Sequence, residues 1–396
     1  MTATFDRLWA DLDPIGRHPG TGGYRRYAWT GEDATLRDWF SGEASARGLD
    51  LITDRAGNQW AWWGDPDAQP GLVVGSHLDS VPDGGAFDGP LGVVSAFAAL
   101  DALREAGFRP GRPIGVVNFG DEEGARFGVA CAGSRMITGA LGAERALGLR
   151  DADGVTMAEA MARAGRDATQ VGRDEQTLGR IGTFVELHVE QGRGLIDLGR
   201  PVAVGSGIWP HGRWRIELPG QANHAGTTRL ADRHDPMLGL AEVIRRARGA
   251  AVDRESVATC GKVRVQPNGV NAIASLVSVW LDARGPVPDS VRGVVADVAA
   301  VVAEHDGQIT EESWTERTAF DGALADRLSR RLDAAPLLDT GAGHDAGVLA
   351  ADGIATAMLF VRNPTGISHS PQEFAEREDC LAGVDALVSV ITDLAQ

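Results

Sequence analysis

Histidine and aspartate stand close together in a segment rich in glycine and proline. The stretch GSHLDSVPDGGAFDGPLG, residues 75–92, holds one histidine and three aspartates among five glycines and two prolines. Because neither a helix nor a core strand favours that composition, the segment is predicted to be a loop that bends back on itself. The loop would present His77, Asp79 and Asp88 together, while Asp83 stabilises a turn. Imidazole nitrogens and carboxylate oxygens of this kind are ligands of divalent metal ions.

Four short apolar runs each lead into residues that can bind a metal ion. They are 71–76 before His77, 113–120 before Glu122 and Glu123, 182–187 before His188, and 356–361 before a loop that ends at His369. Helical patterns, for example at 90–106 and 155–165, separate several of these runs. Apolar runs that alternate with helices indicate an α/β domain with a mostly parallel sheet covered by helices. Ligands of such sheets bind at the carboxyl ends of the strands.

The candidate ligands are numerous enough for two metal ions. Five of them come from four strand ends, and they are His77, Asp88, Glu123, His188 and His369. If one carboxylate bridges, each ion has three protein ligands and keeps positions open for water and substrate. Such a set accepts zinc, manganese, cobalt or nickel. Each residue taken singly is explained as well by a cap of a helix or turn, whereas the whole set favours a metal site.

Three neighbouring acidic residues are predicted to support this site without all binding metal. Asp79 would accept a hydrogen bond from His77 and fix its tautomer. Adjacent Glu122 and Glu123 repel each other unless a cation lies between them, so they call for different roles. If Glu123 binds the ion, Glu122 is free to act as the general base toward the attacking water and to protonate the leaving nitrogen. The alternative is an exposed acidic turn, which the apolar strand before these residues disfavours.

The length of 396 residues predicts two domains. Residues 1–206 and 317–396 form the predicted catalytic domain, which starts with 50 residues of helical pattern and a hairpin at 51–63. Residues 207–316 follow a β-α-β-β-α-β order, the split βαβ arrangement of a small α+β domain. The predicted strands of this inserted domain lie at 213–218, 257–265, 275–284 and 307–316, and its helices at about 234–248 and 288–304.

Composition and charge argue against several classes of partner. The chain has 38 Lys and Arg against 55 Asp and Glu, so its net charge of −17 disfavours nucleic acid and anionic membranes. Cys131, Cys260 and Cys380 suit neither a disulfide scaffold nor a cysteine zinc site. No signal peptide is visible, and no run approaches the roughly 20 apolar residues of a membrane span. A cytoplasmic protein is therefore expected.

Seven motifs resemble those of one enzyme family. They are GSHLDSVPDGGAFDGPLG, DEEGARF, ELHVEQG, GQANHAGTT, PNGVNAI, GAGHDA and GISHSPQE, in order from about residue 70 to 385. The family is that of allantoate amidohydrolases and N-carbamoyl-L-amino-acid hydrolases, dinuclear-metal amidohydrolases related to aminoacylases and zinc carboxypeptidases. The resemblance implies hydrolysis of linear C–N bonds in small ureido or carbamoyl acids. It also implies a zinc-peptidase-like catalytic domain and an inserted ferredoxin-like lid through which two subunits form a homodimer.

The resemblance assigns roles to the metal-type residues. It implies two divalent ions per subunit, bridged by Asp88, with Glu122 as the catalytic base. The remaining ligands that it implies are His77, Glu123, His188 and His369. His188 stands where the peptidase relatives use a carboxylate, which marks the carbamoyl branch.

Further residues are implied to bind the substrate, chiefly through the lid. His224, Asn271 and Arg284 match the motif positions for the substrate carboxylate, Gln191 lies beside the metal loop, and His344 lines the site. His224 is also expected to stabilise the tetrahedral intermediate. The Arg284 guanidinium suits this role because it grips a carboxylate with two parallel hydrogen bonds, although a surface ion pair is the ordinary alternative.

Three other functions compete with this interpretation. An aminoacylase or dipeptidase of the same fold is disfavoured by His188 and the EQG motif that follows it. A non-catalytic metal-binding or ligand-binding protein has no use for Glu122. A structural dimerisation module explains the lid but leaves the loop residues unexplained.

Overall fold

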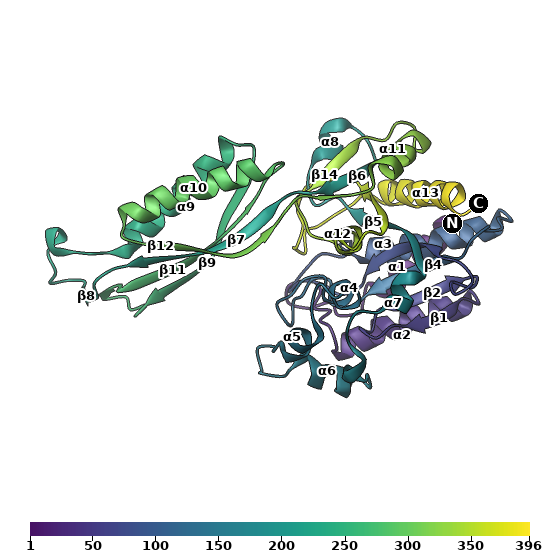
Figure 1. Ribbon diagram of the computed structural model, residues 1–396, viewed down its shortest axis with the longest axis horizontal. Coiled ribbons are helices and arrows are strands. Elements are labelled where there is room, and N and C mark those ends of the chain that lie inside the picture. Colours follow the sequence, from purple (N-terminus) through teal and green to yellow (C-terminus); the bar gives the residue numbers. More distant parts are fainter. The chain divides into compact units, whose positions relative to one another are not determined.

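The computed structural model describes residues 1–396 and divides the chain into two compact units (Figure 1). The first unit combines Met1–Gly207 with Ala319–Gln396, and the second is Ile208–Thr318. None of the helices has both the length and the apolar character needed to cross a membrane.

Two helices precede the sheet of the first unit, α1 (Thr2–Leu12) and α2 (Gly31–Ala46). The prediction of a helical start is wrong for residues 13–30, which form only turns and isolated bridges. Two prolines and four glycines in that stretch disfavour a helix. Thr30 caps α2, because its hydroxyl accepts a hydrogen bond from the backbone N–H of Asp33 at 3.4 Å.

The first unit is built on a nine-stranded mixed sheet. Its strands are β1 (Asp50–Thr53), β2 (Gln59–Trp63), β3 (Gly71–His77), β4 (Ile114–Phe119), β5 (Ile181–Val189), β6 (Val202–Ile208), β13 (Thr318–Ala319), β14 (Leu337–Thr340) and β15 (Ala355–Val361). They lie in the order β1-β2-β4-β3-β5-β15-β6-β13, and β14 pairs with β6.

Four central strands, β4, β3, β5 and β15, run parallel to one another. They are the four apolar runs of the sequence, so the predicted parallel arrangement of these runs is confirmed, within a sheet that is mixed as a whole. The flanking strands β2 and β6 are antiparallel to β4 and β15, and β1 and β2 form the predicted hairpin. Strands β6, β13 and β14 were not predicted. They are short or glycine-containing, and their sequences lack a strong apolar run.

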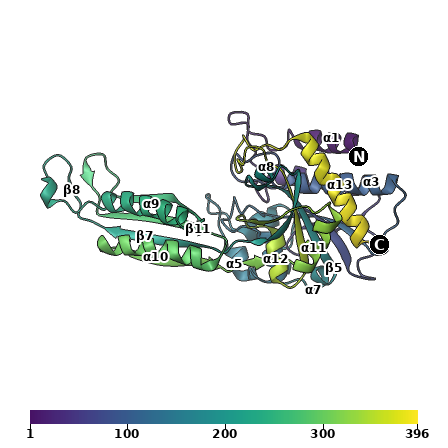
Figure 2. The same cartoon turned by 90° about the horizontal axis from the view of Figure 1, so that it is seen from above.

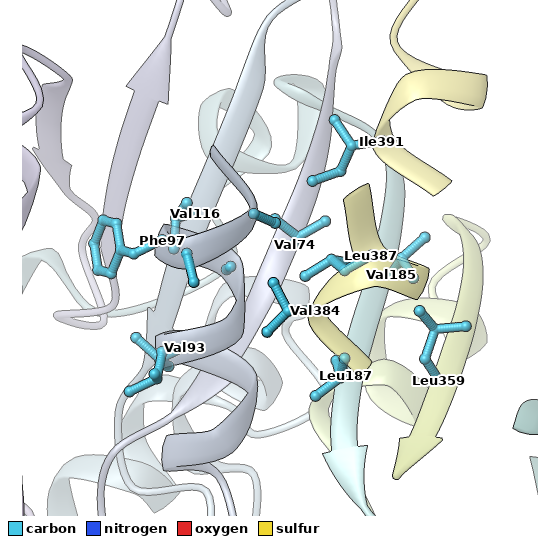
Figure 3. Packing of buried hydrophobic residues seen from close by; sticks show 14 of the residues in the cluster. Val74, Val93, Phe97, Val116, Val185, Leu187, Leu359, Val384, Leu387 and Ile391 are labelled. Atoms are coloured by element: carbon cyan, nitrogen blue, oxygen red, sulfur yellow. The ribbon is translucent and has the colours of Figure 1, made fainter. Parts of the chain in front are cut away.

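Helices cover both faces of this sheet, as Figure 2 shows for α3 (Pro90–Glu105) and α13 (Arg377–Leu394) on one face and α12 (Asp345–Ala351) on the other. Val93, Phe97, Val384, Leu387 and Ile391 of α3 and α13 pack on strand residues that include Val74, Val116, Val185, Leu187 and Leu359 (Figure 3). The remaining helices of the unit are α4 (Ala132–Thr138), α5 (Ala143–Gly148), α6 (Met157–Arg163), α7 (Glu175–Gly179), α8 (Gly194–Leu198) and α11 (Gly322–Arg331).

The second unit is a four-stranded antiparallel sheet with α9 (Pro236–Val252) and α10 (Pro288–Glu304) lying side by side (Figures 1 and 2). Its strands are β7 (His211–Pro219), β9 (Val257–Gln266), β11 (Leu276–Arg284) and β12 (Gln308–Thr315), in the order β12-β7-β11-β9. Along the chain the elements follow a β-α-β-β-α-β order. Two short strands, β8 (Asn223–His224) and β10 (Ala272–Ile273), pair with each other.

Candidate metal centre

The predicted ligands of the first unit meet at one edge of the sheet. His77 is the last residue of β3, Glu123 follows the end of β4, and His188 is the last residue but one of β5. Because these strands are parallel neighbours, their carboxyl ends lie together. Asp88 and His369 come from loops that return to this edge.

Asp88 lies between two groups of candidate ligand atoms. Its Oδ1 is 3.1 Å from Nε2 of His188 and 3.5 Å from Nε2 of His77. Its Oδ2 is 3.4 Å from Nε2 of His369, which in turn lies 3.6 Å from Oε2 of Glu123. Within each group the ligand atoms are less than 4.8 Å apart. Each oxygen of Asp88 therefore faces its own pair of partners.

The imidazoles of His77 and His188 fit a divalent cation. Nδ1 of His77 lies 3.2 Å from the backbone oxygen of Asp79, and Nδ1 of His188 lies 2.8 Å from that of Val189. In the neutral imidazoles these contacts place the proton on Nδ1, so Nε2, which faces Asp88, is the atom left to bind an ion. Both Nε2 atoms are buried and have no hydrogen-bond partner of proper geometry. Two buried imidazole nitrogens and a carboxylate oxygen that converge on one point form a ligand set for a divalent cation, so the residues present suit a metal ion.

Asp79 connects the loop after β3 with the loop after β4. Its carboxylate accepts hydrogen bonds from the backbone N–H groups of Glu122 and Glu123, at 3.1 and 3.0 Å. It also lies 3.4 Å from Nδ1 of His77. The same carboxylate thus faces the first imidazole and fixes the backbone of the two adjacent glutamates.

The charges of the ligand groups are strongly coupled. Burial alone would raise the pKa of Asp88, but the close imidazoles of His188, His369 and His77 outweigh it and hold that pKa well below its usual range. Burial and the charge of Asp88 raise the pKa of Glu123 to about 7. The contact with Asp88 raises the pKa of His369 to about 9. Both groups therefore carry protons that a metal ion would displace near neutral pH.

Glu122 is buried beside the first group of ligands. Its Oε2 lies 3.8 Å from Nε2 of His77, and its Oε1 accepts a hydrogen bond from the Cys131 thiol at 3.4 Å. Burial raises the pKa of Glu122 well above its usual value. A carboxylate with a raised pKa close to a metal site is suited to accept and return a proton. The contact with Cys131 was not predicted, because only the fold brings that cysteine to the glutamate.

Gln191 and His344 also lie at the centre. The Gln191 amide nitrogen donates to Asp88 Oδ2 at 2.9 Å and lies 3.1 Å from the Ser368 hydroxyl. The ring of His344 is 4.5 Å from that of His188, and burial holds its pKa well below the usual value, so it is neutral. Glu186 approaches the same two rings, but its oxygens already accept from the Ser76 hydroxyl at 2.7 Å and the backbone N–H of Ala346 at 3.1 Å.

The glycine-rich loop bends as the sequence predicted. Gly89 has a φ of +83°, and a Cβ at that position would lie 2.4 Å from Cε1 of His77. A glycine therefore lets the chain turn directly over the imidazole and bring Asp88 back to it. Asp83 has a different role. It lies in a turn of the loop, and its carboxylate pairs with Arg25 at 2.8 Å. This agrees with its assignment to a turn.

The residues predicted to bind the substrate carboxylate lie in the second unit, at opposite ends of its sheet. His224 pairs with Ala272, next to Asn271, beyond the end of β7 at Pro219. Arg284 ends β11 opposite His211 at the start of β7 and forms an ion pair with Asp282 at 2.8 Å. At about 3.3 Å per residue, the length of β11 separates the two ends by roughly 26 Å.

Within one chain, therefore, a small substrate cannot touch His224 and Arg284 together.

His211, whose role the sequence left open, is half-buried, and its Nδ1 lies 3.0 Å from the backbone oxygen of Trp209.

Comparisons with known proteins agree with this geometry. The family model described as peptidase family M20/M25/M40 matches residues 73–393. The N-carbamoyl-L-amino acid amidohydrolase of Geobacillus stearothermophilus is 37% identical over 99% of this chain and 98% of its own length. The allantoate amidohydrolase of Bacillus subtilis is 31% identical over 94% of this chain and 93% of its own. The crystal structure of a hydantoinase/carbamoylase family amidase from Burkholderia multivorans has a TM-score of 0.85 at 31% identity, over 99% of this chain and 98% of that one.

The sheet, its polar edge and these matches define a metal-dependent hydrolase of carbon–nitrogen bonds other than peptide bonds. The chain belongs to peptidase family M20/M25/M40, and its similarity to hydantoinase/carbamoylase amidases extends over almost its whole length. The family resemblance read from the sequence is confirmed.

Proposed function

We propose that this protein hydrolyses N-carbamoyl-L-amino acids, or closely related ureido acids such as allantoate, at a centre of two divalent ions. The placement of Asp88 carries the proposal, because each of its oxygens faces a separate set of ligand atoms. His77 and His188 would hold one ion, Glu123 and His369 the other, and Asp88 would bridge them. Zinc, manganese, cobalt and nickel suit this mixture of imidazole and carboxylate ligands.

The chain's own residues supply the proton transfers. Bound divalent ions provide Lewis acidity and bring the pKa of water down to about 7. Glu122 takes the proton of the water that adds to the ureido carbon, and it returns that proton to the nitrogen whose bond to this carbon breaks. The Cys131 thiol occupies Oε1 of Glu122, so the Oε2 atom near His77 is the one that exchanges the proton. Asp79 keeps the backbone of Glu122 in place.

The preference for a carbamoyl group rests on similarity. The relative named as an N-carbamoyl-L-amino acid amidohydrolase is 37% identical to this chain, against 31% for the allantoate amidohydrolase. The family resemblance assigns the substrate carboxylate to Arg284. Its guanidinium makes two hydrogen bonds to Asp282, the ion pair named as the alternative, so a substrate carboxylate would have to share or replace them. Gln191 and the neutral His344 lie close enough to the ligands to contact the ureido group.

The second unit is proposed to act as a lid and to form a homodimer. Leu230 and Val270 are exposed large apolar residues close in sequence to His224 and Asn271. Strand β9 is a ten-residue edge strand with a free side, and its Val257 and Val263 are exposed. A long unpaired edge is a template for pairing with another chain, and exposed apolar patches mark interaction sites. A partner subunit would then supply His224 and Asn271 to a site whose Arg284 belongs to the first chain.

An assay of substrate choice tests the proposal. The protein is loaded with manganese or zinc, and release of ammonia from allantoate and of free amino acid from N-carbamoyl-L-amino acids, N-acetyl amino acids and dipeptides is measured. We expect the carbamoyl compounds to be hydrolysed fastest. Faster hydrolysis of N-acetyl amino acids or dipeptides would indicate an aminoacylase or dipeptidase instead, and no turnover of any compound would contradict the proposal.

A further inference from the structure

A buried carboxylate outside the proposed ligand set joins two ligand-bearing loops. Glu373 is only 4% exposed and follows His369 by four residues. Its Oε1 accepts hydrogen bonds from the backbone N–H groups of Phe87 and Asp88, at 3.0 and 2.9 Å. Its Oε2 accepts one from the Ser368 hydroxyl at 3.0 Å. One side chain therefore holds together two segments that lie 285 residues apart in the sequence.

These contacts hold the loops that carry Asp88 and His369, two of the proposed ligands of the second ion. The hydrogen bond to the N–H of Asp88 fixes the backbone from which that side chain extends. Ser368 adjoins His369, and its hydroxyl also lies 3.4 Å from Asp88 Oδ2. His369 itself has a φ of +55°, a conformation that a residue with a side chain keeps only when its surroundings hold it. The 3.4 Å between Asp88 Oδ2 and His369 Nε2 thus depends on an anchor at the base of both loops.

The loop after β3 is shaped to admit this carboxylate. A Cβ at Gly85 would lie 2.4 Å from both Oε1 and Cβ of Glu373. Any larger residue at that position would push the carboxylate away from the backbone N–H groups that it binds. The need for a glycine here comes from close contact with Glu373, in addition to the bend of the loop. A further contact between these loops, the ring pair Phe87–Phe374 at 6.0 Å, involves a partly exposed phenylalanine.

We propose that Glu373 is the positioning residue that sets the separation of Asp88 and His369 and so completes the ligand set of the second ion. This inference rests on the proposed two-ion centre. Glu373 stands outside the groups of converging ligand atoms, and its two oxygens accept three hydrogen bonds from the two loops. Removal of a residue that holds metal ligands in place typically lowers metal affinity by about 10–100-fold.

Titration of the metal-free protein with Zn²⁺ or Mn²⁺ tests the inference by calorimetry, without reference to turnover. We expect wild type to bind two ions per subunit and Glu373→Ala to bind one normally and the other about 10–100-fold more weakly. Glu373→Gln should stay within roughly threefold of wild type. Its amide oxygen can still accept from the backbone, and its NH₂ group can donate to the Ser368 hydroxyl. The control is Glu376→Ala, which removes the same charge three residues away from an exposed side chain without a capping hydrogen bond.

The possible contrary results have distinct meanings. Two ions bound with wild-type affinity by Glu373→Ala would overturn the inference. Equal weakening in Glu373→Gln and Glu373→Ala would overturn it too, because charge rather than position would then be what matters. If Glu373→Ala does not fold, Gly85→Ala provides the test, since it displaces an intact Glu373 and should weaken the same ion. Normal uptake of both ions by Gly85→Ala would also count against the inference. A wild-type protein that binds no ion would instead remove the proposed centre itself.

Discussion

Buried acidic residues at this centre fall into two groups that differ in what their oxygens bind. Asp79 and Glu373 each accept hydrogen bonds from two backbone N–H groups, so their carboxylates hold loops in place. Asp88, Glu122 and Glu123 accept no backbone hydrogen bond through their side chains, and their oxygens face imidazole nitrogens instead. At the residue scale, this division separates the groups available to ions and protons from the groups that position them.

The pKa values of the ligands predict that metal binding releases protons. In the metal-free protein, Glu123 titrates at about 7 and His369 at about 9, so at pH 7.5 His369 is protonated and Glu123 is partly so. An ion competes with these protons and with those on His77 and His188, whose pKa values the neighbouring carboxylates Glu122 and Asp88 also raise, so its apparent affinity should rise by about tenfold per pH unit for each proton displaced. Calorimetric titration in buffers of different ionisation enthalpy measures the released protons. Heats that do not depend on the buffer would contradict this prediction.

Arg284 is predicted to recognise the carboxylate of the substrate. Loss of a hydrogen-bonded charge pair costs about 2–5 kcal/mol, so Arg284→Ala should lower kcat/KM for acid substrates accordingly. The same change should matter much less for a substrate whose carboxylate is amidated. The matched control is Arg213→Ala, because Arg213 also pairs with Asp282, at 3.3 Å, but is more exposed. Equal losses for the acid and the amide would assign Arg284 a structural role.

At the scale of elements, the parallel strands could be predicted from the sequence, whereas the contacts between their loops could not. Runs 71–75 and 114–117 hold only apolar residues and glycine because both faces of a central strand are buried, and that pattern is readable from the sequence. The polar residues after these runs then had to share one edge. The roles of Cys131 and Glu373 were not predictable, because they arise from contacts between segments brought together only by the fold. The antiparallel strand β6 was missed because its two glycines weaken the strand pattern.

Asp79 is predicted to link the loops after β3 and β4. Asp79→Ala would leave the backbone N–H groups of Glu122 and Glu123 buried without partners, at a cost of about 1–3 kcal/mol for each unsatisfied group. The melting temperature of the metal-free protein should fall and metal affinity should decrease. Asp83→Ala in the same loop removes a partly exposed pair with Arg25 and a hydrogen bond from the exposed Thr21 hydroxyl at 2.7 Å, and it should change both quantities little. Similar melting temperatures and affinities for the two variants would show that Asp79 does not link the loops.

At the scale of the whole molecule, the arrangement of the second unit raises a question about assembly. His224 and Arg284 lie at opposite ends of its sheet, although both are assigned to the substrate. This separation is resolved if each active site takes Arg284 from its own chain and His224 from a partner chain. A symmetric dimer makes two such sites at once.

Subunit exchange tests the shared site. Two inactive variants, His224→Ala and Glu122→Gln, are mixed and allowed to exchange chains. In a mixed dimer the chain that keeps Glu122 receives an intact His224 from its partner, so one of the two sites is whole. Random exchange makes about half of the dimers mixed, and roughly a quarter of wild-type activity should return. If His224 serves its own chain, every site keeps one defect and activity stays at the level of the parent variants.

The two-ion centre itself is tested most directly by counting metal ions. Elemental analysis of purified, metal-loaded protein should give two ions per subunit for wild type and for Glu122→Gln, which keeps every ligand and loses only the base. Asp88→Ala removes the carboxylate that faces both sets of ligands, and it should lose both ions. A fully metallated Asp88→Ala protein, or near-normal turnover by Glu122→Gln, would contradict the account.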